Sequence, residues 1–157
     1  ITNMTDNNSS PSQLPQLYSL QAIGIATFFG SILAGGFLIS ENYRALGMKQ
    51  LGYITLAISL FAFCLSSIAV ANFVGPVVTV EGEMQSINFT PVLLIIIAQV
   101  LGLLFITHVI QGSMLATFTE MQGKFHSTWR AVGMGLVAYI VLATVAYTIL
   151  STLGLNK

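Results

Sequence analysis

The stretch AIGIATFFGSILAGGFLISENYRALGMKQLG, residues 22–52, decides the fold of this chain. It contains an apolar segment, a short charged turn and the start of a second apolar segment. Between Leu17 and Ser40 there is no Asp, Glu, Lys, Arg or His. As an α-helix of about 1.5 Å per residue this segment reaches roughly 36 Å, more than the roughly 30 Å of a bilayer's hydrocarbon core. The stretch therefore predicts a membrane-spanning helix over residues 17–46 and a tight turn into a second helix.

Small residues recur about every four positions along this first helix. The residues predicted to make close helix packing are Ala22, Ala26, Gly30, Ala34 and Gly35. In lipid, such a stripe lets a second helix approach closely. Two interpretations stay open, which are packing inside one four-helix unit and a seam between two copies of the chain. The pair Gly35-Gly36 is also expected to loosen the helix locally, because glycine is a weak helix former.

The spacing of residues in the charged turn after this helix predicts its local structure. Glu41 and Arg44 are three residues apart, so they share a helix face and are expected to form an interfacial ion pair. Gly47 is predicted to end the helix in a left-handed conformation. A connection this short makes the first two helices antiparallel neighbours.

Composition places the chain in the membrane. Hydrophobic residues make up 55% and charged residues 6%, with a mean hydropathy of +0.85, whereas a soluble domain carries about 25% charged residues. A net charge of zero indicates no nucleic-acid partner. The pattern predicts an all-α integral membrane protein with a flexible polar tail over residues 1–16 and one domain over residues 17–157. The four predicted transmembrane helices cover residues 17–46, 51–73, 91–122 and 128–153, and a short hairpin is considered for residues 77–89.

Basic residues predict the orientation. Arg44 and Lys49 lie in the first connection, and Lys124 and Arg130 lie in or next to the third. The second connection has no Lys or Arg. By the positive-inside rule the first and third connections are cytoplasmic. Both termini are therefore predicted to lie on the non-cytoplasmic side.

Few side chains offer chemistry. Gln99 is the deepest strongly polar residue, predicted to hydrogen-bond a neighbouring helix, with a place in a permeation path as the alternative. His108 is a candidate haem ligand and, together with Glu120 and His126, a candidate metal ligand, but the spacing of these three residues matches no pair of ligands on one helix face. Cys64 is expected to pack as a small apolar residue. The chain is therefore predicted to have no catalytic residue, no cofactor and no metal.

Two segments resemble a known group of proteins. FFGSILAGGFLISENYRALG at residues 28–47 and HSTWRAVGMGL at residues 126–136 are similar to small four-helix bacterial inner-membrane proteins with an NYRALG turn after the first helix. The resemblance implies a multi-pass protein of the bacterial cytoplasmic membrane and attaches no function. It also implies a cytoplasmic contact face, whose residues are Glu41, Asn42, Tyr43, Arg44, Ser127, Trp129 and Arg130. The alternative is that these are turn, cap and anchor residues.

The functional hypothesis from sequence is a non-enzymatic accessory or assembly subunit of a larger membrane complex, with membrane lipids and other integral membrane subunits as partners. It is based on the small-residue faces, which offer more packing surface than a lone bundle needs. The alternative is a homo-oligomeric channel or carrier for a neutral or lipidic solute, lined by Thr, Ser, Tyr and Gln99. A haem-bearing electron carrier depends on His108 alone.

Overall fold

The structure is a computed structural model that describes residues 14–74 and 89–152. Four helices account for most of these residues: α1 (Leu20–Ala45), α2 (Lys49–Val74), α3 (Thr90–Glu120) and α4 (Thr128–Thr152). All four are long and apolar enough to cross a membrane, so the predicted all-helical class is confirmed. The hairpin considered for residues 77–89 lies, apart from Phe89, outside the described residues.

The first helix does not run straight. Gly30 (φ −120°, ψ 15°) and Ser31 (φ 70°, ψ 177°) leave the helical conformation, and the chain doubles back on itself at this point. We call residues 20–29 the first arm and residues 32–45 the second arm. The backbone N–H of Tyr18, just before the first arm, donates to Asn42 Oδ1 near the end of the second over 2.6 Å. In a straight helix, residues this far apart in sequence would be separated by about 36 Å.

Contacts along the arms confirm the antiparallel arrangement. A Cβ on Gly35 in the second arm would collide with the Thr27 side chain in the first arm, and the two arms share one apolar core cluster. The arms are about 15 Å and 21 Å long, so neither reaches across a hydrocarbon core of about 30 Å. The prediction of one continuous helix over residues 17–46 is therefore wrong, because α1 is folded into a helical hairpin with two antiparallel arms.

The turn of this hairpin has identifiable local causes. A Cβ on Gly30 would lie 2.7 Å from the Cα of Gly135 in α4, so only glycine allows the tip this close to α4. Ser31 has a positive φ, which a side chain disfavours at a cost of about 1–3 kcal/mol. Its hydroxyl accepts the N–H of Leu33 at 3.3 Å and caps the second arm. The break is thus at Gly30–Ser31, and the expected loosening at Gly35-Gly36 is wrong because those glycines pack closely within the second arm.

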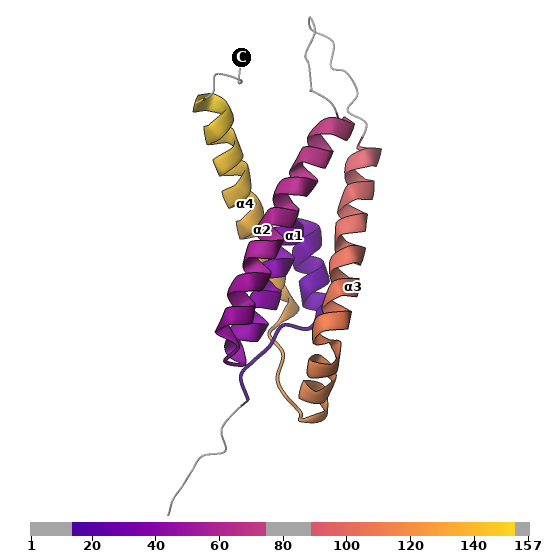
Figure 1. The fold of residues 1–157 in the computed structure, drawn as a ribbon, viewed down its shortest axis with the longest axis vertical. Helices are drawn as coiled ribbons and strands as arrows, with labels where there is room; N and C mark the ends of the chain where they lie inside the picture. The colour runs from indigo at the N-terminus through magenta and orange to yellow at the C-terminus, as the bar shows by residue number, and fades with distance from the viewer. Residues whose placement is uncertain (1–13, 75–88, 153–157) are drawn as a thin grey trace, which may run out of the picture.

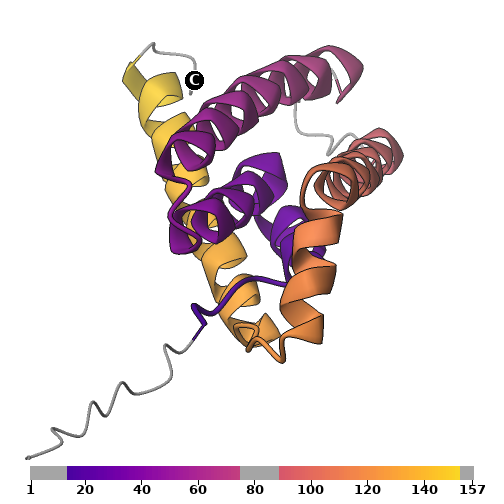
Figure 2. The ribbon, with the colours of Figure 1, turned by 60° about the horizontal axis from the view of Figure 1, so that its bottom comes forward.

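The other helices surround this hairpin. α1 contacts α2, α3 and α4, and α2 contacts α3, so α1 lies between the other three (Figures 1 and 2). The burial of the helices agrees with this arrangement. In an 18-residue apolar segment of each helix, 61% of the residues are buried in α1 and 6–11% in the other three helices. The non-helical backbone at Gly30–Ser31 thus lies in the helix that the rest of the chain covers most.

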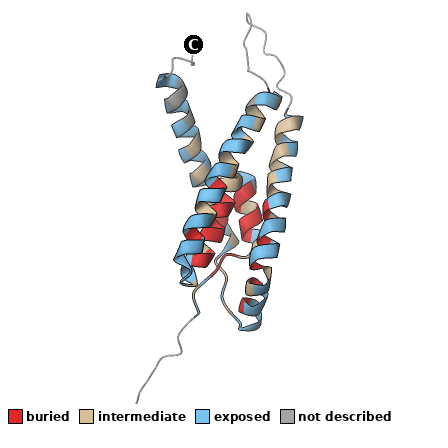
Figure 3. Cartoon of the chain, viewed as in Figure 1, coloured by how far each residue is buried: buried red, intermediate tan, exposed pale blue. Residues whose placement is uncertain are grey.

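Burial is confined to one end of the molecule (Figure 3). The buried residues of α3 are Leu103, Thr107, Gln111, Leu115 and Phe118, which form one face toward α1. In the described parts of α2 beyond Ser59, of α3 before Leu103 and of α4 beyond Gly135, no residue is buried. The core therefore ends at about the level of the hairpin tip, and the three outer helices separate beyond it.

Because α1 doubles back, the described chain begins and ends at opposite ends of the molecule. Leu17 N–H donates to Lys124 O at 3.4 Å, and His126 N–H donates to Leu17 O at 2.8 Å. The start of the described chain thus lies beside the α3–α4 connection and the α1–α2 turn, whereas Thr152 lies at the opposite end (Figure 1). This separation of the two ends follows because the two arms of α1 run antiparallel. Leu17 and Tyr18 are correspondingly buried against the helices.

Candidate functional site

A groove with a volume of about 680 Å³ lies between the second arm, α2 and α4. We call it the lateral groove. Its lining residues are Leu33, Ala34, Phe37, Leu56, Arg130, Gly133, Met134, Val137, Ala138, Val141 and Leu142. Arg130 is the one charged residue among them. The groove is open to the side, because within the described chain α4 contacts α1 and neither α2 nor α3.

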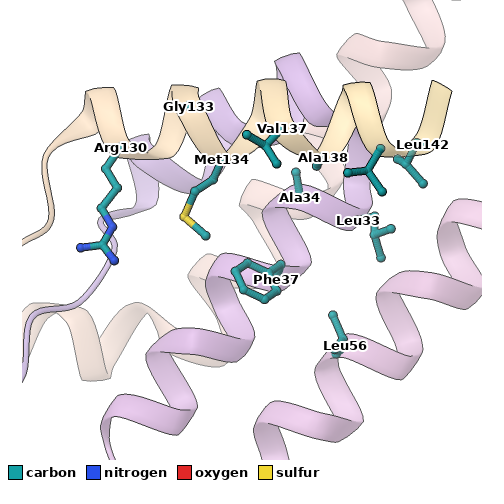
Figure 4. Close-up of a pocket in the computed structure, with 11 residues that line it drawn as sticks. Leu33, Ala34, Phe37, Leu56, Arg130, Gly133, Met134, Val137, Ala138 and Leu142 are labelled. Atoms are coloured by element: carbon teal, nitrogen blue, oxygen red, sulfur yellow. The ribbon is translucent and has the colours of Figure 1, made fainter. Parts of the chain in front are cut away.

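One face of α4 forms a wall of the groove. From Arg130 to Leu142 its lining positions are spaced by alternating steps of three residues and one, a pattern that keeps them on one side of a helix. Figure 4 shows Arg130 at one end of this row and Leu142 at the other, with Phe37 and Leu33 of the second arm facing them. The row is about 18 Å long at about 1.5 Å per residue. The groove is therefore elongated and apolar, with the charged side chain of Arg130 at one end.

Aromatic and polar groups stand beside the charged end of the groove. The rings of Tyr18 and His126 lie 4.5 Å apart, and the Tyr18 hydroxyl donates to Met134 Sδ at 3.2 Å. Arg130 Nη1 is 3.5 Å from His126 Nδ1. Partial burial, and then the positive charge of Arg130, lower the pKa of His126 below its usual 6.5. At neutral pH this histidine is accordingly neutral, and Arg130 supplies the positive charge here.

A buried polar cluster fixes the hairpin at the same end of the molecule. Asn42 accepts from Tyr18 N–H and donates through Nδ2 to Tyr18 O at 2.9 Å and to Gln111 Oε1 at 3.3 Å. Gln111 donates in turn to Ile39 O at 3.2 Å. Both amide side chains are fully buried. They join the segment before α1, the second arm and α3, so they hold the two ends of α1 together.

We predict that Asn42→Leu destabilises the protein by at least about 3 kcal/mol, because it leaves the Tyr18 N–H, the Tyr18 carbonyl and Gln111 Oε1 without partners in a buried place. Denaturant-induced unfolding in detergent micelles measures this. The control is Asn72→Leu, since Asn72 is exposed and donates only to Ile68 of its own helix; its change is expected to stay within about 0.5 kcal/mol. Equal stabilities of the two variants would contradict a structural role for Asn42.

The predicted contact face is not one surface. Asn42 and Tyr43 are buried, whereas Trp129 is 82% exposed and Arg130 lines the groove. The ion pair predicted between Glu41 and Arg44 is confirmed, with 2.6 Å between Oε1 and Nη1. Asn42 and Tyr43 cannot contact a partner from inside the core, which leaves Trp129, Arg130 and the Glu41–Arg44 pair outside.

The five small residues Ala22, Ala26, Gly30, Ala34 and Gly35 are all buried. They do not form one stripe on one helix, because the first two lie in the first arm and the last two in the second. Gly47 has φ +81°, as the left-handed turn requires. These small side chains pack the hairpin within the chain, as the first of the two sequence interpretations expects.

The polar residues singled out in the membrane lie outside the core. Gln99 is half-buried and His108 is exposed, with the His108 ring lying along its own helix near Gly112. The hydrogen bonds between helices are instead made by Gln111, which sequence reasoning passed over. Its position four residues after Thr107, on the face that carries Leu103 and Leu115, was the signal that could have found it.

Residues considered for chemistry are dispersed. Cys64 is exposed on α2, and among the described residues no group of three His, Cys, Asp or Glu side chains is placed to hold a metal ion. Glu120 ends α3, and His126 follows in the connection to α4. No family model, no curated protein and no solved structure matches this chain.

Proposed function

We propose that this chain is a non-enzymatic, multi-pass membrane protein that binds a lipidic solute in the lateral groove and acts as its carrier. The observation that carries this proposal is the groove itself, which is elongated, lined almost entirely by aliphatic and aromatic side chains, and open to the side. Such a surface takes up hydrocarbon, and apart from Arg130 its side chains offer an ion or a sugar no hydrogen-bonding partners.

The position of the groove fits a lipid. Arg44, Lys49, Lys124 and Arg130 all lie at the end that holds the α1–α2 turn and the α3–α4 connection. By the positive-inside rule this end is cytoplasmic, which supports a chain that enters from the cytoplasmic side, turns back at Gly30–Ser31 and then crosses with α2, α3 and α4. The groove then runs from the cytoplasmic interface into the hydrocarbon core. With the resemblance to bacterial inner-membrane proteins, we place the protein in that membrane.

The carrier interpretation replaces the accessory-subunit hypothesis as the first choice, because the small residues of α1 that were expected to form a docking face are buried inside the chain. One observation still favours a partner subunit. Beyond the hairpin tip no described residue of α2, α3 or α4 is buried, and a transmembrane helix of another protein also fits an open side of this kind. Gln99 and the tyrosines of α4 do not line the groove, so the solute path proposed here differs from the polar one expected from sequence.

Native mass spectrometry of the protein extracted gently from its membranes tests the proposal. We expect one lipid to stay bound to the wild type. Gly133→Phe is expected to lower this occupancy by about tenfold, the change that about 1.4 kcal/mol of lost binding free energy produces, because Gly133 lines the groove and has open space around it. Gly102→Phe is the matched control, since Gly102 also faces open space but lies on α3 outside the groove.

The result also separates the two functions. Equal lipid occupancy in all three proteins would refute the groove as a lipid site. A stoichiometric foreign subunit that is lost in Gly133→Phe, with no bound lipid in the wild type, would assign the groove to a partner helix and restore the accessory-subunit hypothesis.

A further inference from the structure

Arg130 makes the two ends of the lateral groove chemically different. The side chain is exposed at one end of the groove, while the other lining positions on α4, from Gly133 to Leu142, are apolar. Figure 4 shows its guanidinium on the same side of α4 as Met134. A molecule lying along the groove therefore has its hydrocarbon part next to the apolar side chains and one end next to a cation.

The charge of Arg130 is not compensated by the described part of the chain. Of the described carboxylates, Glu41 is paired with Arg44, and none lies within ion-pair distance of Arg130. The nearest polar side-chain group is His126 Nδ1 at 3.5 Å, and that ring is neutral at neutral pH. A guanidinium presents several N–H donors in a planar fork that matches the oxygens of a phosphate.

The length of the groove agrees with one leaflet. From Arg130 to Leu142 it measures about 18 Å, and half of the hydrocarbon core is about 15 Å thick. The cation stands at the basic end, where the headgroup layer is expected, and the apolar residues follow it inward. This matches the arrangement of head and chain in a bilayer phospholipid.

We propose that the groove binds an anionic glycerophospholipid, with one acyl chain along α4 and the phosphate at Arg130. This inference builds on the proposed function and adds the class of headgroup. A basic side chain near a membrane surface strengthens the binding of anionic lipid by about fivefold. The protein is therefore expected to prefer phosphatidylglycerol over phosphatidylcholine with the same chains by about that factor.

The chain carries its own reporter for this preference. Trp129 is the only tryptophan, is largely exposed and is next to Arg130 in sequence. Bromine atoms on lipid chains quench tryptophan fluorescence at short range. The experiment reconstitutes the full chain in phosphatidylcholine vesicles at low ionic strength and compares quenching by brominated phosphatidylglycerol and brominated phosphatidylcholine at equal mole fractions.

Three variants accompany the wild type. Arg130→Gln is expected to reduce the preference from about fivefold to about one. Arg44→Gln is the matched control, because Arg44 lies at the same end but is paired with Glu41 and does not line the groove; it should keep the preference. Gly133→Phe retains every charge and fills the groove, so it should lose the preference as well.

Each result decides between distinct explanations. A preference that survives in Gly133→Phe would overturn the proposal, because it would come from surface charge alone. A preference equally lost in Arg44→Gln would overturn it for the same reason. Displacement of the brominated phosphatidylglycerol by a small fraction of palmitate would identify a free fatty acid and not a phospholipid. No preference in the wild type, combined with a lipid lost from Gly133→Phe in native mass spectrometry, would refute the anionic headgroup and leave the proposed function standing.

Discussion

Cysteines introduced at Gln16 and Gln50 will react with a membrane-impermeant maleimide from the same side of the membrane, and a cysteine at Thr152 will react from the opposite side. All three positions are exposed. Gln16 precedes the first arm and Gln50 lies in the first turn of α2. The doubled-back path of α1 brings both to the end that holds the α3–α4 connection. The difference is all or none, because a charged maleimide does not cross the hydrocarbon core.

The labelling uses a Cys64→Ala background, which removes the one native thiol. Sealed vesicles of known orientation are treated with the reagent before and after they are opened. A cysteine at Gln122, in the α3–α4 connection, serves as a further reference for the Gln16 side. If Gln16 and Gln50 are labelled from opposite sides, α1 crosses the membrane once, and the sequence-based topology with a straight first helix is correct instead.

Gly35→Ala will lower the stability of the protein by about 2 kcal/mol or more, the range for forcing atoms into a packed core. A Cβ at this position collides with the Thr27 side chain of the opposite arm and with Leu103 of α3. Gly102→Ala is the control, because a Cβ there meets nothing within 4 Å. Since alanine is the better helix former, that variant is expected to be more stable by up to about 1 kcal/mol. Thermal and denaturant unfolding in micelles measure both.

A double variant makes this prediction specific to the hairpin. Thr27→Ala removes the hydroxyl that the new Cβ would meet, so Thr27→Ala with Gly35→Ala should recover part of the loss. We expect a coupling between the two substitutions of about 1–2 kcal/mol. In a straight helix these residues would be about 12 Å apart along the axis and would not couple directly. Strictly additive effects would therefore argue against the packed arms.

Much of the architecture could be predicted from composition and pattern. The absence of charge from Leu17 to Ser40 predicts an apolar environment whether the segment crosses or turns back. The three other helices begin and end close to the expected residues, since their limits are set by Pro91, by the charged connections and by the polar residues after α3. The Glu41–Arg44 pair and the left-handed Gly47 follow from local spacing, because they involve only neighbouring residues.

The candidate site could be predicted only in fragments. Arg130 was identified as an interface residue, but nothing in its own segment pairs it with Phe37 or Leu56, which reach the groove from other helices. Asn42 was assigned to a contact face because it stands beside charged residues in a turn. Its burial depends on Gln111, a residue far along the chain. Such pairings depend on long-range packing, to which local hydrophobicity and helix propensity give no access.

The sequence by itself determined the class of this protein, because the number of charged residues and the length of the apolar segments decide which solvent the chain can tolerate. The tertiary structure decided the path of the first segment, the burial of Asn42 and Gln111, and the groove with Arg130 at its end. The physical reason lies at Gly30–Ser31. A sequence that is apolar and helical on both sides of this pair permits either a straight crossing or a turn. The balance between them is set by the close approach of Gly30 to Gly135 and by the hydrogen bonds that join Tyr18 to Asn42, contacts that exist only in the folded chain.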